Sequence, residues 1–251
     1  MIEVRHLAKY YGRFTALRDL DLDVGAGECV ALFGRNGAGK TTLLRILAGL
    51  ARPSSGSFQI KSTDGKSGKS DKLRQRGAIG YLSHNTSLYP DLTALENLRF
   101  FAGLMDAPTD ENALVRRMEA VGLAGREREP VRNFSRGMQQ RLAIARAFLH
   151  DPEILLLDEP FTGLDRLGCD ILGDYIRQAR AGGKTCLVAL HDLELGYELA
   201  DRLVVIEKGV AALDEPKSAL TPDSFSEKFR NLIESKGPER KSHGGFRGSH
   251  G

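Results

Sequence analysis

Apolar and polar residues alternate along two segments near the beginning of the chain. Residues 2–4 read apolar, polar, apolar, and residues 20–24 repeat the pattern with aspartates at the polar positions. Because successive side chains of a strand point to opposite faces of its sheet, this pattern predicts half-exposed antiparallel strands. Residues 57–60, which follow the turn residues 53–56, are predicted as a further strand.

Other segments are short, almost unbroken apolar runs. The run at residues 153–158 ends in acidic residues and predicts a strand that is buried on both faces of a parallel sheet. Residues 187–190 and 203–206 repeat this pattern, and residues 28–33 and 78–82 are predicted as strands as well. Apolar residues at helical spacing predict helices at residues 41–50 and 171–181.

Helical spacing dominates the middle of the chain, from about residue 84 to residue 150. The strongest helix is predicted at residues 135–149, with Ser135 as its N-cap and Pro152 shortly beyond its end. Residues 93–101 and 112–121 are predicted as further helices. The pattern predicts an α/β core with an antiparallel β part at its N-terminus and an inserted all-helical part at about residues 84–150.

The core is expected to end at residue 213, with a helical extension at residues 214–236. Ser224 and Glu227 form a capping-box pattern that predicts the start of this helix. Residues 237–251 are mostly Gly, Ser, His and Arg and are expected to be disordered. Residues 61–76 are rich in Lys, Ser, Gly and Asp and predict a solvated loop, with a basic membrane-facing patch as the alternative.

The composition excludes several classes of protein. A chain of 251 residues with 41% hydrophobic and 27% charged residues is typical of a globular protein, and a net charge of +3 is too small to indicate nucleic acid binding. The scattered cysteines Cys29, Cys169 and Cys186 suit a reducing cytosol and are expected to be packing residues. No apolar run approaches the roughly 20 residues that span a bilayer, so a membrane role is expected to need a partner.

The strongest chemical signal is the stretch from Gly34 to Thr42, which lies between a predicted strand and a predicted helix. Its glycines let backbone N–H groups point at phosphate oxygens, and the helix start adds a partial positive charge. Lys40 is expected to reach the β and γ phosphates, and the Thr41 hydroxyl to bind Mg²⁺. The alternative is a glycine turn with a chance lysine. The pattern predicts an ATP or GTP site that uses Gly34, Asn36, Gly37, Ala38, Gly39, Lys40, Thr41 and Thr42.

An acidic pair at the end of the strand at residues 153–158 supplies the remaining chemistry. Asp158 is expected to hold Mg²⁺ through water, and Glu159 to orient or deprotonate the attacking water. A purely structural acid pair is the alternative interpretation.

The sequence Phe-Ser-Arg-Gly-Met-Gln-Gln-Arg at residues 134–141 resembles the signature of ABC transporter ATPases, and the resemblance extends over residues 1–213. It implies a P-loop NTPase core with the antiparallel and helical parts described above. In that family two subunits, here a homodimer or pseudo-dimer, enclose two ATP molecules with Mg²⁺. Ser135 and Gly137 would then face the γ-phosphate on the opposite subunit, an anion position that suits a helix N-terminus. An ordinary helix cap is the alternative role for Ser135.

The resemblance implies further roles. Tyr11, or the adjacent Tyr10, resembles the aromatic residue that stacks on adenine, residues 163–165 resemble the D-loop, and His191 matches the switch histidine. His84 stands where the family usually has glutamine, and an imidazole can still accept a hydrogen bond from a metal-bound water. Arg136 and Met138 replace the usual glycine and glutamine of the signature, which leaves the hydrolysis rate open.

Together with residues 81–84 and 88–100, these departures make the sequence resemble the CcmA-type haem-exporter ATPases of cytochrome c maturation. The resemblance implies a peripheral ATPase on the cytoplasmic face of the cell membrane, coupled to an integral membrane permease subunit and not to nucleic acid. The permease would dock in a groove near residues 84–89 and 95–101, although packing within the helical part is the alternative use of those apolar residues. The alternatives are exporters of drugs, lipids or polysaccharides, a non-transport ABC protein, and a nucleotide-gated module with little turnover.

Overall fold

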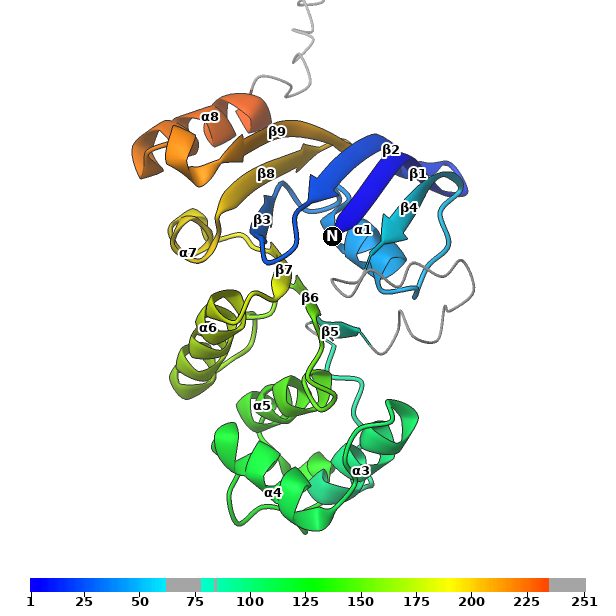
Figure 1. Ribbon diagram of the computed structural model, residues 1–251, viewed down its shortest axis with the longest axis vertical. Helices are drawn as coiled ribbons and strands as arrows, with labels where there is room; N and C mark the ends of the chain where they lie inside the picture. The colour runs from blue at the N-terminus through cyan, green and yellow to red at the C-terminus, as the bar shows by residue number, and fades with distance from the viewer. Residues whose placement is uncertain (62–77, 84, 235–251) are drawn as a thin grey trace, which may run out of the picture.

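The computed structural model describes residues 1–61, 78–83 and 85–234 of the chain (Figure 1). The strands are β1 (Ile2–Tyr11), β2 (Phe14–Val24), β3 (Cys29–Phe33), β4 (Ser55–Ile60), β5 (Ile79–Ser83), β6 (Ile154–Asp158), β7 (Thr185–Ala189), β8 (Arg202–Glu207) and β9 (Val210–Pro216). The helices are α1 (Lys40–Leu47), α3 (Ala94–Leu104), α4 (Glu111–Ala120), α5 (Arg136–Ala147), α6 (Arg166–Ala181), α7 (Leu193–Leu199) and α8 (Pro222–Glu234), with short 3₁₀ turns at Val131–Asn133 and Lys217–Ala219.

The strands form an antiparallel sheet in the order β2-β1-β4 and a larger sheet in the order β5-β6-β7-β3-β8-β9. In the larger sheet the five strands β5, β6, β7, β3 and β8 run parallel to one another. The last strand, β9, pairs antiparallel with β8. The strand β3 lies between β7 and β8, with Cys29 opposite Cys186 and Val30 opposite Arg202. Cys29 and Cys186 are buried free thiols, in agreement with the expected packing role.

Buried side chains cover both faces of the larger sheet, which explains the unbroken apolar runs. In β3, Ala31 and Phe33 belong to a core that includes the faces of α3 to α8, whereas Val30 and Leu32 belong to a second core with α1 and the smaller sheet. The same division holds in β6. The prediction of a parallel sheet that is buried on both sides is therefore confirmed.

The helices α3, α4 and α5 lie together at the end of the molecule remote from the smaller sheet (Figure 1). A capping box starts α3: the Thr93 hydroxyl accepts a hydrogen bond from the Glu96 N–H at 3.2 Å, and the Glu96 carboxylate accepts one from the Thr93 N–H at 2.8 Å. The predicted helical insertion is present, because α3, α4 and α5 occur between the parallel strands β5 and β6. The predicted loop at residues 61–76 lies almost entirely outside the described residues, as does the tail at 237–251.

The first two strands are longer than predicted. The pairing of β1 with β2 contains irregularities between Val4 and Leu7 and again near Lys9, and His6 has a backbone φ of 50°. Such bulges shift the alternation of side chains between the two faces, so the sequence pattern stops before the strand does.

The start of the last helix was predicted wrongly. The capping interaction joins Thr221 and Ser224: the Ser224 N–H donates to the Thr221 hydroxyl at 3.2 Å, and the Thr221 N–H donates to the Ser224 hydroxyl at 2.9 Å. Helix α8 therefore begins at Pro222, since proline suits the first helical position, and not at the Ser224–Glu227 pattern. The sequence analysis also missed α7 and β9.

Candidate active site

The phosphate-loop candidate connects β3 to α1 in a conformation that requires glycine at two positions. Gly34 has a φ of 144°, and a Cβ atom there would lie 2.2 Å from the carbonyl oxygen of Ile206. Gly39 has a φ of 119°, and a Cβ atom would lie 2.6 Å from the carbonyl oxygen of Ala16. No side chain caps the N-terminus of α1. Its first N–H groups are therefore suited to an anion in the loop.

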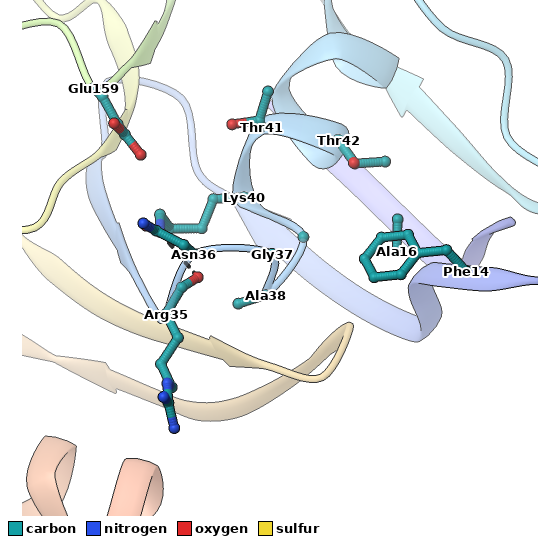
Figure 2. A pocket seen from close by; sticks show the side chains of 11 residues that line it. Phe14, Ala16, Arg35, Asn36, Gly37, Ala38, Lys40, Thr41, Thr42 and Glu159 are labelled. Carbon is teal, nitrogen blue, oxygen red and sulfur yellow. Dashed lines mark hydrogen bonds between the residues drawn. The ribbon is translucent and has the colours of Figure 1, made fainter. Parts of the chain in front are cut away.

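The loop surrounds a cavity of about 260 Å³. Figure 2 shows Phe14 and Glu159 at opposite ends of this cavity, with Lys40 and Thr41 between them. Most residues predicted to bind the nucleotide line it. The complete lining consists of Phe14, Ala16, Arg35, Asn36, Gly37, Ala38, Gly39, Lys40, Thr41, Thr42 and Glu159.

Lys40 is the buried cation of this cavity. Only 4% of the residue is exposed, and its Nζ atom donates a hydrogen bond to the Gly34 carbonyl oxygen at 2.7 Å. Burial lowers the pKa of the Lys40 ammonium, while the charges of Glu159 and Asp158 oppose that shift. The loop thus holds a partly desolvated positive charge, which strengthens its attraction to phosphate.

Thr41 and Asp158, the two predicted metal ligands, lie together. The Thr41 hydroxyl donates a hydrogen bond to Asp158 Oδ1 at 2.9 Å, and Asp158 is 1% exposed at the end of β6. A hydroxyl and a carboxylate are the hard oxygen ligands that Mg²⁺ prefers, so this pair fits a magnesium ion bound beside the phosphates.

Tyr81 is a neighbour of Asp158 that the sequence analysis did not assign. Burial raises the pKa of the Tyr81 phenol to about 12, and the charge of Asp158 adds to the shift. The strand pairing places Ser83 opposite Asp158 and Tyr81 two residues earlier on the edge strand β5. No sequence motif marks this tyrosine, because its position depends on the register of β5 against β6.

Glu159 and His191, which are both predicted to be catalytic, lie in contact with each other. The His191 Nε2 atom lies 2.7 Å from Glu159 Oε1, although the two residues follow different strands. Glu159 has a φ of 50°, a strained conformation for a residue with a side chain, and its backbone N–H donates to the Ala189 carbonyl oxygen at 3.1 Å. This arrangement directs the carboxylate to the cavity, as a general base requires. The remaining predicted catalytic residue, His84, lies outside the described residues.

An aromatic residue missed by the sequence analysis lies at the other end of the cavity. Phe14 lines it and is 56% exposed, whereas Tyr11 pairs with Phe14 across the hairpin and has the Lys9 ammonium 4.8 Å from its ring centroid. Tyr10 and Tyr11 are both 48% exposed, so the choice of adenine-stacking residue between them stays a prediction.

The predicted signature residues lie at the start of α5 and do not line the cavity of their own chain. The Ser135 hydroxyl accepts a hydrogen bond from the Met138 N–H at 3.3 Å. A Cβ atom on Gly137 would lie 2.9 Å from Asp165 Oδ2, so the signature packs directly against the predicted D-loop. Their role across a dimer stays a prediction.

A glycine loop between strand and helix, a buried lysine and an acidic pair at the end of β6 define a P-loop nucleoside triphosphatase. The family model described as ABC transporter matches residues 17–162. The chain therefore belongs to the ABC transporter family, as an ATP-binding subunit that hydrolyses ATP.

Curated relatives include proteins of different transport systems. The sulfate/thiosulfate import ATP-binding protein CysA 2 of Rhizobium meliloti is 39% identical over 215 residues, covering 83% of this chain and 58% of that protein. The Nod factor export ATP-binding protein I of Cupriavidus pinatubonensis is 37% identical, with coverage of 83% and 64%. The lantibiotic transport ATP-binding protein SrtF of Streptococcus pyogenes is 32% identical, with coverage of 93% and 97%. The chain thus spans less than two thirds of the first two relatives.

Solved structures agree with the fold. An ATP-binding subunit of an ABC transporter superposes with a TM-score of 0.80 at 29% identity, covering 92% of this chain and 99% of that chain. The ATP-binding cassette MJ0796, described as dimeric and bound to ADP and Pi, gives a TM-score of 0.75 at 26% identity, with coverage of 86% and 99%. Among the described residues of the present chain, no helix is long and apolar enough to cross a membrane.

Proposed function

We propose that the chain drives export through a separate integral membrane subunit, and that Glu159 is the general base of its ATPase. The observation that carries the catalytic assignment is the 2.7 Å contact between Glu159 and His191 beside the phosphate loop. Three kinds of group converge there: a base, a buried cation and a pair of metal ligands. Such convergence supports attack of water on a terminal phosphate.

Each group of residues has a separate role in the reaction. The N–H groups of the loop and the Lys40 ammonium bind and orient the phosphates. Thr41 and Asp158 would hold Mg²⁺, which supplies Lewis acidity when bound. Glu159 accepts a proton from the attacking water at Oε1 or Oε2, and His191 orients that carboxylate through its Nε2 atom.

The second half of each site is proposed to come from a second copy of the chain, with Ser135 and Gly137 placed on the γ-phosphate of the opposite loop. The dimeric state of MJ0796 supports this arrangement. The start of α5 favours it as well, since the first N–H groups of a helix lack partners within the helix and attract an anion.

A surface on the helical insertion is proposed to receive the membrane subunit at the cytoplasmic face. The rings of Tyr89, Phe100 and Phe101 lie against one another with centroid distances of 5.1, 6.0 and 5.3 Å. Tyr89 is 47% exposed and Phe100 44% exposed, an unusual amount of aromatic surface at one place.

The proposed cargo is haem, in a system of cytochrome c maturation. This finer proposal rests on the sequence around residues 81–84 and on the variant signature at residues 134–141. The relatives described above are named for Nod factor export, lantibiotic transport and sulfate/thiosulfate import, so a different transported molecule is the second candidate.

Two experiments test these proposals. Hydrolysis of ATP by the purified chain, measured with and without the membrane subunit, distinguishes a transport ATPase from a nucleotide-gated module with little turnover. Deletion of the gene from its host tests the cargo. We expect loss of mature cytochromes c, whereas normal cytochrome c assembly in a strain without a second copy would reject haem and retain the exporter ATPase.

A further inference from the structure

Helix α5 carries two arginines that are equally buried but have different surroundings. Arg141 and Arg146 are each 8% exposed. Arg141 donates hydrogen bonds to the carbonyl oxygens of Val121 at 3.0 Å and Gly122 at 2.8 Å, and its Nε atom lies 3.5 Å from Asp165 Oδ2. The buried Nε atoms of both arginines lack a hydrogen-bond partner, but the guanidinium of Arg146 also forms no other hydrogen bond or ion pair with any residue that the structure describes.

The contacts of Arg146 are with an aromatic surface. Its guanidinium carbon lies 5.1 Å from the ring centroid of Phe101, and burial lowers its pKa to about 10. A ring face attracts a cation but supplies no acceptor for its N–H groups. Burial costs this guanidinium its hydration, and no carboxylate among the described residues compensates for that loss.

An apolar patch adjoins this cation through Phe101. We use the name α3 patch for Tyr89, Phe100, Phe101 and Leu104, of which Tyr89, Phe100 and Leu104 are 47%, 44% and 66% exposed. Phe100 and Leu104 are four residues apart on α3 and therefore share one face of the helix. The patch and the buried cation together are suited to an apolar segment that carries one negative charge.

We infer that the α3 patch receives a cytoplasmic segment of the membrane subunit and that an Asp or Glu of this segment forms a hydrogen-bonded ion pair with Arg146. A carboxylate accepts two parallel N–H bonds from a guanidinium, which an aliphatic or amide side chain cannot match. A purely apolar partner would cover the patch, but it would exclude water from the Arg146 guanidinium without offering an acceptor for its N–H groups. This inference rests on the proposed function only in requiring a membrane subunit.

The isolated protein tests whether Arg146 lacks a partner within the chain. Arg141→Met removes interactions with three residues, so we expect its melting temperature to fall by about 5 °C or more. Arg146→Met removes an unpaired charge, and we expect its melting temperature to equal or exceed that of the wild type, with an unchanged KM for ATP. A fall like that of Arg141→Met would show an internal partner and overturn the inference.

The complex tests the partner. The wild-type chain and its variants are tagged in the native host, and the membrane subunit that copurifies from detergent extracts is quantified. Arg146→Met and Arg146→Glu should reduce its retention by more than about tenfold, and Arg146→Lys should restore part of it. Replacement of one Asp or Glu by Arg in the cytoplasmic segments of that subunit should rescue Arg146→Glu and no other variant.

The outcomes separate the two proposals. Full retention by Arg146→Met, or rescue of Arg146→Glu only by changes within this chain, contradicts the ion pair and leaves the proposed function in place. A carboxylate supplied by a second copy of this chain would appear as rescue by a change in the chain itself. Absence of any membrane subunit from the wild-type complex contradicts the proposed function together with the inference.

Discussion

Glu159 and His191 lie 2.7 Å apart, between Oε1 and Nε2, although 32 positions separate them in the sequence. The parallel pairing of β6 with β7 brings them together, because Asp158 lies opposite Ala189 at the same edge of the sheet. The carboxyl ends of neighbouring parallel strands thus supply the acid pair and the histidine at one place, where open α/β sheets usually bind their ligands.

Replacement of Glu159 by Gln is expected to nearly abolish turnover while ATP still binds. The amide has nearly the shape of the carboxylate but accepts no proton, so kcat should fall by about 10²- to 10⁴-fold. Steady-state hydrolysis and calorimetric titration with ATP measure the two effects. Sedimentation should show a dimer of the variant at saturating Mg-ATP. A monomer with bound nucleotide would contradict the two-copy site.

Replacement of Lys40 by Ala should act on binding. The variant loses a charge-assisted contact to phosphate, which corresponds to a loss of about 2 kcal/mol or about 30-fold in ATP affinity. Lys228→Ala is a suitable control, since Lys228 forms an exposed ion pair with Glu215. An ATP affinity of Lys40→Ala equal to that of the control would mean that the phosphate loop is assigned wrongly.

Two phenylalanines should respond in opposite ways to truncation. Phe225 is 1% exposed with its ring centroid 5.0 Å from that of Phe33, so Phe225→Ala should lower the free energy of unfolding by about 3–5 kcal/mol. Phe14 is 56% exposed at the cavity, so Phe14→Ala should leave stability nearly unchanged and weaken ATP binding. Urea denaturation and nucleotide titration of both variants check this pattern. Equal ATP affinity of Phe14→Ala and wild type would remove Phe14 from the site.

The pH dependence of stability should contain a contribution from His150. Burial lowers the pKa of the His150 imidazole, whose Nε2 atom lies 3.2 Å from the Ile79 carbonyl oxygen. The unfolded chain therefore binds the proton more readily than the folded chain. The free energy of unfolding should fall as the pH drops below about 6.5, the ordinary value, and level off below the lowered pKa.

His6 provides the control for this prediction. A hydrogen bond with Asp19 raises the pKa of His6, so any contribution of its charge is present below about pH 6.5 and is lost as the pH rises through the raised value. Melting curves of His150→Gln and His6→Gln between pH 5 and 8 should therefore deviate from the wild type in opposite directions. Parallel curves for His150→Gln and the wild type would refute the assignment.

The sequence was sufficient to predict a site where the functional residues are neighbours along the chain. The phosphate loop could be predicted because its glycines, lysine and threonine follow one another between a strand and a helix. Phe14 and Tyr81 could not, because each reaches the site through strand pairing whose register includes bulges or distant partners. The start of α8 was predicted wrongly because two capping patterns overlap at Ser224, and Pro222, which lies inside the first pattern, suits the first helical position.

The contrast between Arg141 and Arg146 also had no sequence signal. Both arginines occupy the same helix, and what separates them is the end of α4 at Val121 and the N-cap Asp165 of α6. Such differences arise only when distant segments pack together.

The position of β3 between β7 and β8 has a consequence for synthesis of the protein. The strand that leads into the phosphate loop is made early, yet its partner residues start at Cys186 on one side and Arg202 on the other. Phe33 also packs against Phe225, which belongs to the last described helix and is synthesised later still. The growing chain therefore carries an unpaired apolar strand until residues 186–205 have left the ribosome, and a fragment that stops before residue 185 exposes two unpaired strand edges to aggregation.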